Sequence, residues 1–166
     1  RIIVDCIKSW SKNKPVEIRS PDATRPWQHV LEPLSGYLTL AKNIYENKNI
    51  QGNAYNFGPK SGQNKTVLKL IEDLSTYWNT ELTEPYKITD QVPFYEAGLL
   101  KLNCDKALLD LKWESTLDYQ ETVSMIGEWY KENLNKSNDM YSFTLKQIAD
   151  YENIAKERRL IWVNES

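Results

Sequence analysis

Apolar residues recur at three- and four-residue steps along much of the chain, and this period predicts amphipathic helices. The predicted helices cover residues 1–12, 28–47, 66–78, 118–134 and 144–158, with a shorter one over 105–111. The clearest pattern follows Thr66, a good N-cap residue, and consists of Val67, Leu70, Ile71, Leu74 and Trp78. Asp118 and Glu121 have the spacing of a capping box at the start of another helix.

The helix predicted over 28–47 has a marked apolar stripe, which we expect to be its buried face. Pro33 falls in the first turn, where its missing N–H costs little. Gly36 in the interior costs about 1 kcal/mol relative to alanine. This cost favours a close packing contact at Gly36, with a part of the protein outside this chain as one candidate partner. The stripe consists of Leu31, Leu34, Leu38, Ala41, Ile44 and Tyr45.

Short strands are predicted over 16–19, 54–57, 86–89 and 99–102. In these segments apolar and polar residues alternate, or strand-forming residues occur, next to residues typical of turns. The fold class is therefore α+β, predominantly helical with a few short strands. Residues 136–139 form a polar linker, which divides a region of residues 1–135 from a C-terminal helical extension of residues 136–166. The tail after Arg159 shows no clear period.

Composition indicates one globular domain, because 40% of the 166 residues are apolar and 27% are charged. The net charge of −2 gives no general attraction to nucleic acid or to an anionic membrane. No apolar run approaches the roughly 20 residues of a membrane helix. Cys6 and Cys104 are expected to be reduced core thiols in a cytoplasmic protein. A single histidine argues against a zinc site, so no metal is expected.

Candidate binding chemistry lies in the run Arg25-Pro26-Trp27-Gln28-His29, directly before the helix over 28–47. Free backbone N–H groups at a helix N-terminus attract anions, and an arginine beside them matches a phosphate. An exposed ion pair would place an arginine there equally well. The chain has neither a Gly-x-Gly-x-x-Gly loop nor a Tyr-x-x-x-Lys pair. These features indicate a binding region whose catalytic groups lie elsewhere.

The chain resembles the C-terminal part of the CDP-glucose 4,6-dehydratases, which are extended short-chain dehydrogenase/reductase enzymes. The specific stretch is Arg-Pro-Trp-Gln-His-Val-Leu-Glu-Pro-Leu from Arg25. Arg1-Ile2-Ile3-Val4-Asp5, Tyr55-Asn56-Phe57-Gly58-Pro59 and Leu100-Lys101-Leu102-Asn103 follow the family order. The resemblance covers roughly residues 1–155. It implies a substrate-binding region that lacks most of the Rossmann sheet, and the chain's start at Arg1, in mid-helix pattern, suggests a piece of a longer protein.

The resemblance implies substrate-binding roles for Arg25, Arg1, Asn56 and Glu96. In the family, the arginine at the place of Arg25 contacts the diphosphate of the nucleotide sugar. A basic residue like Arg1 lies close to the nucleotide, and Glu96 belongs to a loop that approaches it. Asn56 could equally be a turn residue, and Glu96 a solvated loop charge. His29 is expected to be structural, and no catalytic residue is expected in this chain.

The complete enzyme of this family uses NAD to oxidise the sugar at C4, loses water across C5 and C6, and returns the hydride to C6. The present chain alone is expected neither to turn over a CDP-sugar nor to bind NAD. Its expected partner is a missing N-terminal Rossmann half, on which helices 1–12 and 28–47 would pack. Without that half, an exposed apolar patch could drive homo-oligomer formation.

Two alternatives remain at the level of the sequence. The first is a related enzyme that acts on another nucleotide sugar as a dehydratase, epimerase or reductase, because residues before Arg1 set the chemistry in this group. The second is a non-catalytic helical interaction module, which would bind a partner protein and respond to no nucleotide.

Overall fold

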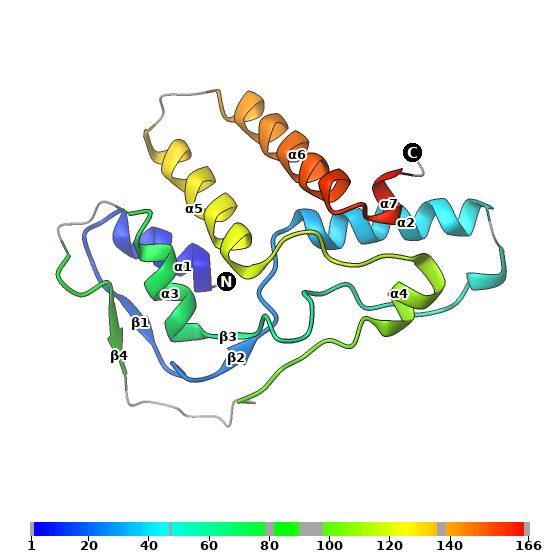
Figure 1. Cartoon of the computed structure of the whole chain (residues 1–166). Helices are drawn as coiled ribbons and strands as arrows, with labels where there is room; N and C mark the ends of the chain where they lie inside the picture. Colours follow the sequence, from blue (N-terminus) through cyan, green and yellow to red (C-terminus); the bar gives the residue numbers. More distant parts are fainter. Residues whose placement is uncertain (1, 47, 79–81, 90–97, 136–138, 165–166) are drawn as a thin grey trace.

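The computed structural model describes residues 2–46, 48–78, 82–89, 98–135 and 139–164, and helices make up most of it (Figure 1). The α-helices are α1 (Ile2–Trp10), α2 (Leu31–Glu46), α3 (Val67–Ser75), α4 (Asp105–Leu111), α5 (Tyr119–Asn135), α6 (Met140–Glu157) and α7 (Ile161–Asn164). The strands are β1 (Val16–Ile18), β2 (Thr24–Arg25), β3 (Lys65–Thr66) and β4 (Tyr86–Ile88), and a 3-10 turn, η1, spans Lys48–Ile50. The predicted α+β class with few short strands is confirmed.

The main core lies where α1, α3, α5 and the β1–β4 pair meet. β1 and β4 run parallel, with Val16 opposite Tyr86. Trp10 is fully buried, and its indole N–H donates to the Pro85 carbonyl at 2.7 Å. The predicted apolar faces of α1 and α3 both turn into this core, which confirms those two helices and their orientation. The buried residues are Cys6, Ile7, Trp10, Val16, Ile18, Leu70, Ile71, Leu74, Tyr119 and Val123.

Both predicted helix caps are confirmed. The Thr66 hydroxyl accepts from the Lys69 N–H at 3.1 Å and begins α3. The Glu121 N–H donates to Asp118 Oδ1 at 2.8 Å, and the Asp118 N–H donates to Glu121 Oε2 at 2.7 Å. These bonds satisfy N–H groups that a helix start leaves without an intrahelical acceptor.

β2 lies between two other segments of chain. It pairs antiparallel with β3, with Thr24 opposite Thr66 and Arg25 opposite Lys65. Thr24 also forms an isolated parallel bridge with Leu99, and its N–H donates to the Gly98 carbonyl at 2.8 Å. Three distant parts of the sequence therefore converge beside Arg25.

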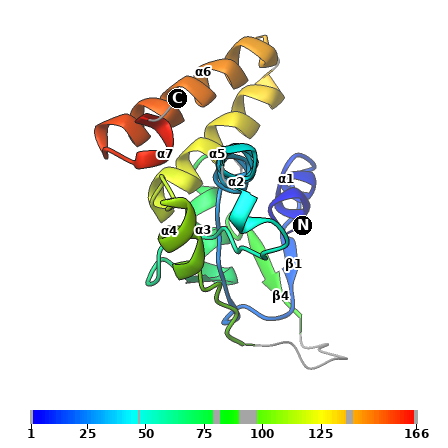
Figure 2. The ribbon, with the colours of Figure 1, turned by 90° about the vertical axis from the view of Figure 1, so that its right-hand side faces the viewer.

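The C-terminal helices pack back onto the rest of the chain (Figures 1 and 2). α6 lies along α5, and the Gln147 amide donates to the Met125 carbonyl at 2.8 Å. The Arg158 guanidinium donates to the Thr116 carbonyl and to Glu121 Oε1, the latter at 2.7 Å. Tyr151 and Trp162 stack with ring centroids 5.7 Å apart. Residues 139–164 thus contact the segment that leads into α5.

Some expected elements differ in the structure. Residues 54–57 form no strand, because no neighbouring segment offers them a ladder among the residues described. Of 99–102 only Leu99 makes a bridge. The last predicted helix starts earlier, at Met140, where the Asp139 side chain caps it, and the tail contains α7. Across the described ranges, no helix has both the length and the apolar character needed to cross a bilayer.

Candidate functional site

Arg25 ends β2, six positions before α2 begins at Leu31. Its side chain is half-buried, and Nη1 donates to the Thr24 carbonyl at 2.8 Å. The neighbouring Trp27 packs against the main core and donates its indole N–H to the Lys65 carbonyl at 2.8 Å. Trp27 therefore packs rather than offering a stacking surface, and it fixes the β3 backbone beside Arg25.

The expected free amides at the start of α2 are absent, and that part of the sequence prediction is wrong. The Leu31 N–H donates to His29 Nδ1 at 3.3 Å, and the Glu32 N–H donates to the His29 carbonyl at 3.1 Å. Pro33 has no N–H, and the Leu34 N–H donates to the Val30 carbonyl. An anion beside Arg25 must therefore be held by side chains rather than by this helix start.

Asn56 lies in the exposed segment before Phe57, and its amide donates to the Asn103 carbonyl at 3.2 Å. The structure connects this segment to the Arg25 run, because the Gln28 side chain donates to the Phe57 carbonyl at 3.2 Å. Arg1 and Glu96 lie outside the described residues. Gly98 and Leu99, which follow Glu96 closely in sequence, contact Thr24.

The predicted burial of the apolar stripe of α2 is wrong for this chain. Leu34, Leu38 and Tyr45 are 46%, 73% and 90% exposed, whereas Glu32, Ser35, Gly36 and Thr39 on the opposite side are buried. Figure 2 looks along the axis of α2. In this view α4 and α7 lie on one side of α2, and α1 lies on the other. Gly36 does have a close contact, since a Cβ there would lie 2.4 Å from Phe57 Cδ1. Its partner is therefore inside the chain.

Sequence reasoning missed the buried hydrogen-bond cluster on that polar side. Both carboxylate oxygens of Glu32 accept from the Thr116 N–H, at 3.0 and 3.1 Å, and Oε1 also accepts from the Leu117 N–H at 2.7 Å. The Tyr151 hydroxyl donates to Oε2 at 3.0 Å. Burial raises the pKa of Glu32, and these bonds oppose that rise. Glu32 therefore joins α2 to α6 and to the residues before α5.

Ser35 extends this cluster. Its hydroxyl donates to the Glu32 carbonyl at 2.8 Å, lies 3.0 Å from the Tyr151 hydroxyl, and accepts from the Trp113 indole N–H at 3.0 Å. A usable signal was present in the sequence, because Ser35, Gly36 and Thr39 place small residues on one side of a helix. Small residues allow neighbouring backbone and side chains to approach closely.

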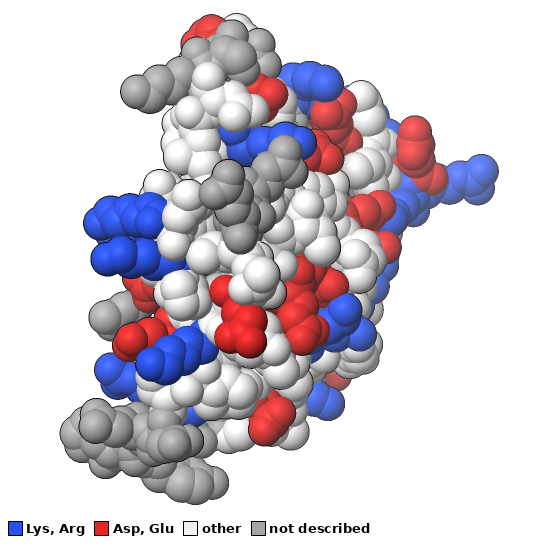
Figure 3. Space-filling view, turned by 90° about the vertical axis from the view of Figure 1, so that its left-hand side faces the viewer, with Lys and Arg blue, Asp and Glu red and all other residues white. Residues whose placement is uncertain are grey.

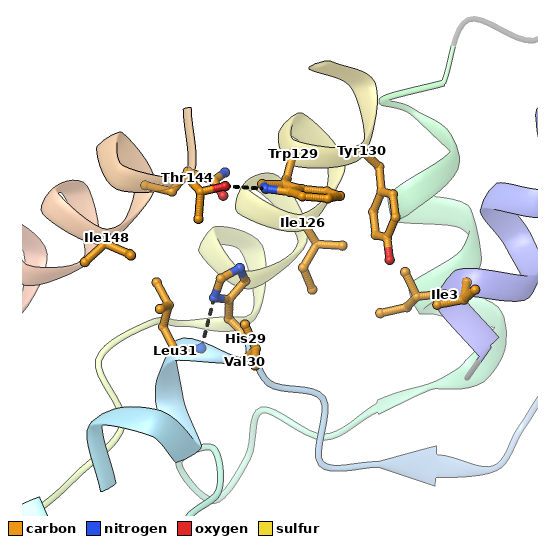
Figure 4. Close-up of a pocket in the computed structure, with 11 residues that line it drawn as sticks. Ile3, His29, Val30, Leu31, Ile126, Trp129, Tyr130, Thr144 and Ile148 are labelled. Carbon is orange, nitrogen blue, oxygen red and sulfur yellow. Dashed lines mark hydrogen bonds between the residues drawn. The ribbon is translucent and has the colours of Figure 1, made fainter. Parts of the chain in front are cut away.

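An apolar pocket of about 350 Å³ opens between α1, the start of α2, α5 and α6 (Figure 4). His29 is 8% exposed, and burial lowers its pKa to about 4. The ring is neutral at pH 7, and because Nδ1 accepts from Leu31, Nε2 carries the proton. On the far wall, the Trp129 indole donates to the Thr144 hydroxyl at 3.0 Å. No described serine, cysteine or carboxylate forms a catalytic pair with His29.

Charge is mixed over the face drawn in Figure 3, where acidic and basic side chains alternate. Among the described residues, no group of three or more histidine, cysteine, aspartate or glutamate side chains could hold a metal ion. Burial raises the pKa of the Cys6 thiol to about 12, so it is not a nucleophile at neutral pH.

The chain is similar to a curated protein described as CDP-glucose 4,6-dehydratase from Salmonella typhimurium strain LT2. The two are 35% identical over 151 residues, which is 91% of this chain and 41% of that protein. The chain thus spans less than half the length of this relative, which fits a piece of such a protein. No protein-family model matches the chain.

Solved structures show the same fold. UDP-glucuronic acid 4-epimerase from Bacillus cereus, in complex with UDP-glucuronic acid and NAD, superimposes with a TM-score of 0.66 at 20% identity. The match covers 81% of this chain and 40% of the epimerase. dTDP-glucose 4,6-dehydratase from Bacillus anthracis, in complex with NAD, matches with a TM-score of 0.63 at 16% identity, over 80% of this chain and 39% of the dehydratase. The chain therefore has the fold of part of an extended short-chain dehydrogenase/reductase.

Proposed function

We propose that this chain is the nucleotide-sugar-binding C-terminal part of an NAD-dependent CDP-glucose 4,6-dehydratase. The observation that carries the proposal is the 35% identity to the Salmonella dehydratase across 91% of the chain. The fold shared with a nucleotide-sugar epimerase and a second dehydratase supports it. The complete enzyme would convert CDP-glucose to its 4-keto-6-deoxy product.

In this proposal Arg25 holds the diphosphate of the substrate. A planar guanidinium matches phosphate oxygens with paired, charge-assisted hydrogen bonds, and a lysine does not reproduce that geometry. Asn56, Arg1 and Glu96 would contact the nucleotide end. Binding energy from this remote part of the substrate would position the sugar, where the reaction takes place.

The redox groups of the reaction lie outside this chain. The sequence contains no glycine-rich dinucleotide loop and no Tyr-x-x-x-Lys pair. We therefore assign no step of the NAD chemistry to these residues and expect the chain alone to be inactive.

The remaining part of the enzyme would cover the exposed face of α2. Val30, Leu34, Tyr37, Leu38 and Tyr45 are all exposed, and they fall on one side of the helix. Val30 also lines the pocket beside His29, so the pocket continues this apolar surface. An N-terminal Rossmann half would bury both features in the complete protein.

Calorimetric titration of CDP-glucose into the chain joined to an upstream half tests the proposal. Arg25→Met should weaken binding about tenfold or more, because a charge-assisted hydrogen bond contributes about 1.5–3 kcal/mol. Arg19→Met serves as the matched control, since Arg19 is exposed on a different segment. Equal affinity of wild type and Arg25→Met would reject the site, and the absence of a 4-keto-6-deoxy product would reject the assigned reaction.

A second candidate is a related enzyme that acts on a different nucleotide sugar. The fold match to an epimerase solved in complex with UDP-glucuronic acid supports this second candidate. A competition series with CDP-, UDP- and dTDP-sugars separates the two. Preference for the CDP-sugar supports the dehydratase assignment, and preference for another nucleotide supports the alternative.

A further inference from the structure

We infer that Lys65 is a second cationic ligand of the diphosphate, acting opposite Arg25. The inference rests on the proposed function and adds a residue to its binding site. It comes from the pairing of β2 with β3, in which Arg25 and Lys65 are direct partners.

The register brings the two side chains to the same face of the ladder. Directly opposed residues of an antiparallel pair have Cβ atoms about 4.5–5.5 Å apart on one face. Two cationic side chains so placed can contact the same anion from neighbouring strands. Both residues are half-buried, which strengthens their attraction to an anion relative to fully solvated side chains.

Lys65 makes no ion pair within the described part of the chain, whereas Lys60, Lys69 and Lys106 each make one. Lys60 contacts Glu114 at 2.9 Å, Lys69 contacts Asp73 at 2.7 Å, and Lys106 contacts Asp110 at 2.7 Å. The Lys65 ammonium instead lies 5.7 Å from the centre of the Tyr119 ring. An aromatic face leaves the ammonium's N–H groups able to bind an anion.

The backbone around Lys65 is held in place. The Trp27 indole donates to the Lys65 carbonyl, and the next residue, Thr66, caps α3. Such anchoring lowers the entropy lost when the side chain binds a ligand, because only the side chain remains to be ordered.

Backbone amides near Lys65 cannot replace its charge. At the start of α3 the Val67 N–H donates to the Ala23 carbonyl and the Leu68 N–H to the Pro21 carbonyl, both at 2.9 Å. The Lys69 N–H donates to the Thr66 hydroxyl. The first amides of α2 are likewise occupied. A phosphate bound beside Arg25 and Lys65 would therefore be held by side-chain cations.

The two cations suit a diphosphate better than a monophosphate. A guanidinium can bind one phosphate group through paired hydrogen bonds, and an ammonium acts as a point charge for the other. Removing Lys65 should thus reduce affinity for CDP more than affinity for CMP, because CMP lacks the second phosphate.

The experiment titrates inorganic pyrophosphate, CDP and CMP at low ionic strength into the whole chain, followed by amide chemical shifts. Lys65→Met keeps the aliphatic stem but removes the charge. We expect it to bind CDP and pyrophosphate about tenfold more weakly. Lys69→Met is the matched control and should stay within about twofold of wild type. Lys65→Arg should restore most of the affinity, and thermal unfolding checks that each variant is folded.

The outcomes separate the inference from the proposed function. Loss of affinity in both Arg25→Met and Lys65→Met, with CMP little affected by Lys65→Met, supports it. Loss in Arg25→Met alone overturns the role of Lys65 and leaves the proposed function standing. If pyrophosphate at millimolar concentration perturbs the amide of none of Thr24, Arg25, Lys65 and Thr66 in the wild type, the role of Lys65 and the diphosphate site at Arg25 are both overturned.

Discussion

The two faces of α2 reverse the usual distribution of polar and apolar residues. The face turned into the chain is polar or small, with Glu32, Ser35, Gly36 and Thr39 buried. The face turned outward is apolar, and Leu38 on it is 73% exposed. An amphipathic pattern shows which side of a helix avoids water in the complete protein, but not which polypeptide covers it. The proposed function accounts for the reversal, because the proposed N-terminal half would cover the apolar face.

Hydrogen bonds hold the buried face, together with the close contact between Gly36 and Phe57. Glu32 is a buried carboxylate, and its bonds to Thr116, Leu117 and Tyr151 offset the cost of taking it from water. The exposed face contributes little to the stability of this chain, because its side chains gain little burial on folding. Substitutions on the buried face should therefore reduce the free energy of unfolding much more than substitutions on the exposed face.

The largest expected effect is at Glu32. Glu32→Ala leaves the N–H groups of Thr116 and Leu117 and the Tyr151 hydroxyl without their acceptor, so the free energy of unfolding should fall by about 3–5 kcal/mol. Urea unfolding followed by circular dichroism measures it. Glu32→Gln keeps one acceptor oxygen and should cost less. A loss below about 1 kcal/mol for Glu32→Ala would show that the cluster does not hold α2 in place.

A smaller effect is the pH dependence of stability that comes from His29, which lies two residues before the start of α2. Burial lowers the folded-state pKa of His29 from 6.5 to about 4. Between these values the unfolded chain binds a proton that the folded chain excludes, so stability falls as pH decreases through this window and is unaffected above it. The loss from this residue reaches at most about 3 kcal/mol.

The comparison of wild type with His29→Gln isolates this contribution, because a glutamine oxygen can still accept from the Leu31 N–H. Glu32 acts in the opposite direction, since its raised pKa favours the folded state at low pH and loses that contribution as pH rises. The difference in the free energy of unfolding between wild type and His29→Gln should therefore depend on pH below about 6.5. A difference that is the same at every pH would contradict the buried, neutral histidine.

The smallest effect on folding is expected on the outward face. Leu38→Glu should change the free energy of unfolding by less than about 0.5 kcal/mol, because the side chain is largely solvated. It should nevertheless weaken any self-association seen by analytical ultracentrifugation. Asn153→Glu adds the same charge to an exposed position of α6 and serves as the control. Equal association of both variants and wild type would show that this face does not drive contact between copies.

Local signals made much of the fold predictable. α1 and α3 have apolar faces that meet inside the chain, and Thr66, Asp118 and Glu121 make caps through neighbours a few residues away. The two-residue strands β2 and β3 are too short to show alternation, and α7 is too short to show a helical period. Residues 54–57 have the composition of a strand, but strand formation also requires a partner that sequence alone does not supply.

The candidate site was predictable only in part. Arg25 stands out because the resemblance assigns it a role, and its position beside a convergence of three segments is compatible with that role. Lys65 could not be found from sequence, because it lies forty positions away and becomes a neighbour through strand register. Glu32 was missed because a glutamate in a first helical turn ordinarily faces water and complements the helix dipole.

The reach of Tyr151 from α6 to the Glu32 carboxylate has a consequence for where this polypeptide can be shortened. A chain ending at Asn135 would lose that phenol. It would also lose the hydrogen bond from the Gln147 side chain to the Met125 carbonyl and those from Arg158 to Thr116 and Glu121. The Glu32 carboxylate would then lose a hydrogen-bond donor, and water would enter where the phenol had been. The C-terminal residues thus stabilise the middle of the chain, although they come last in the sequence.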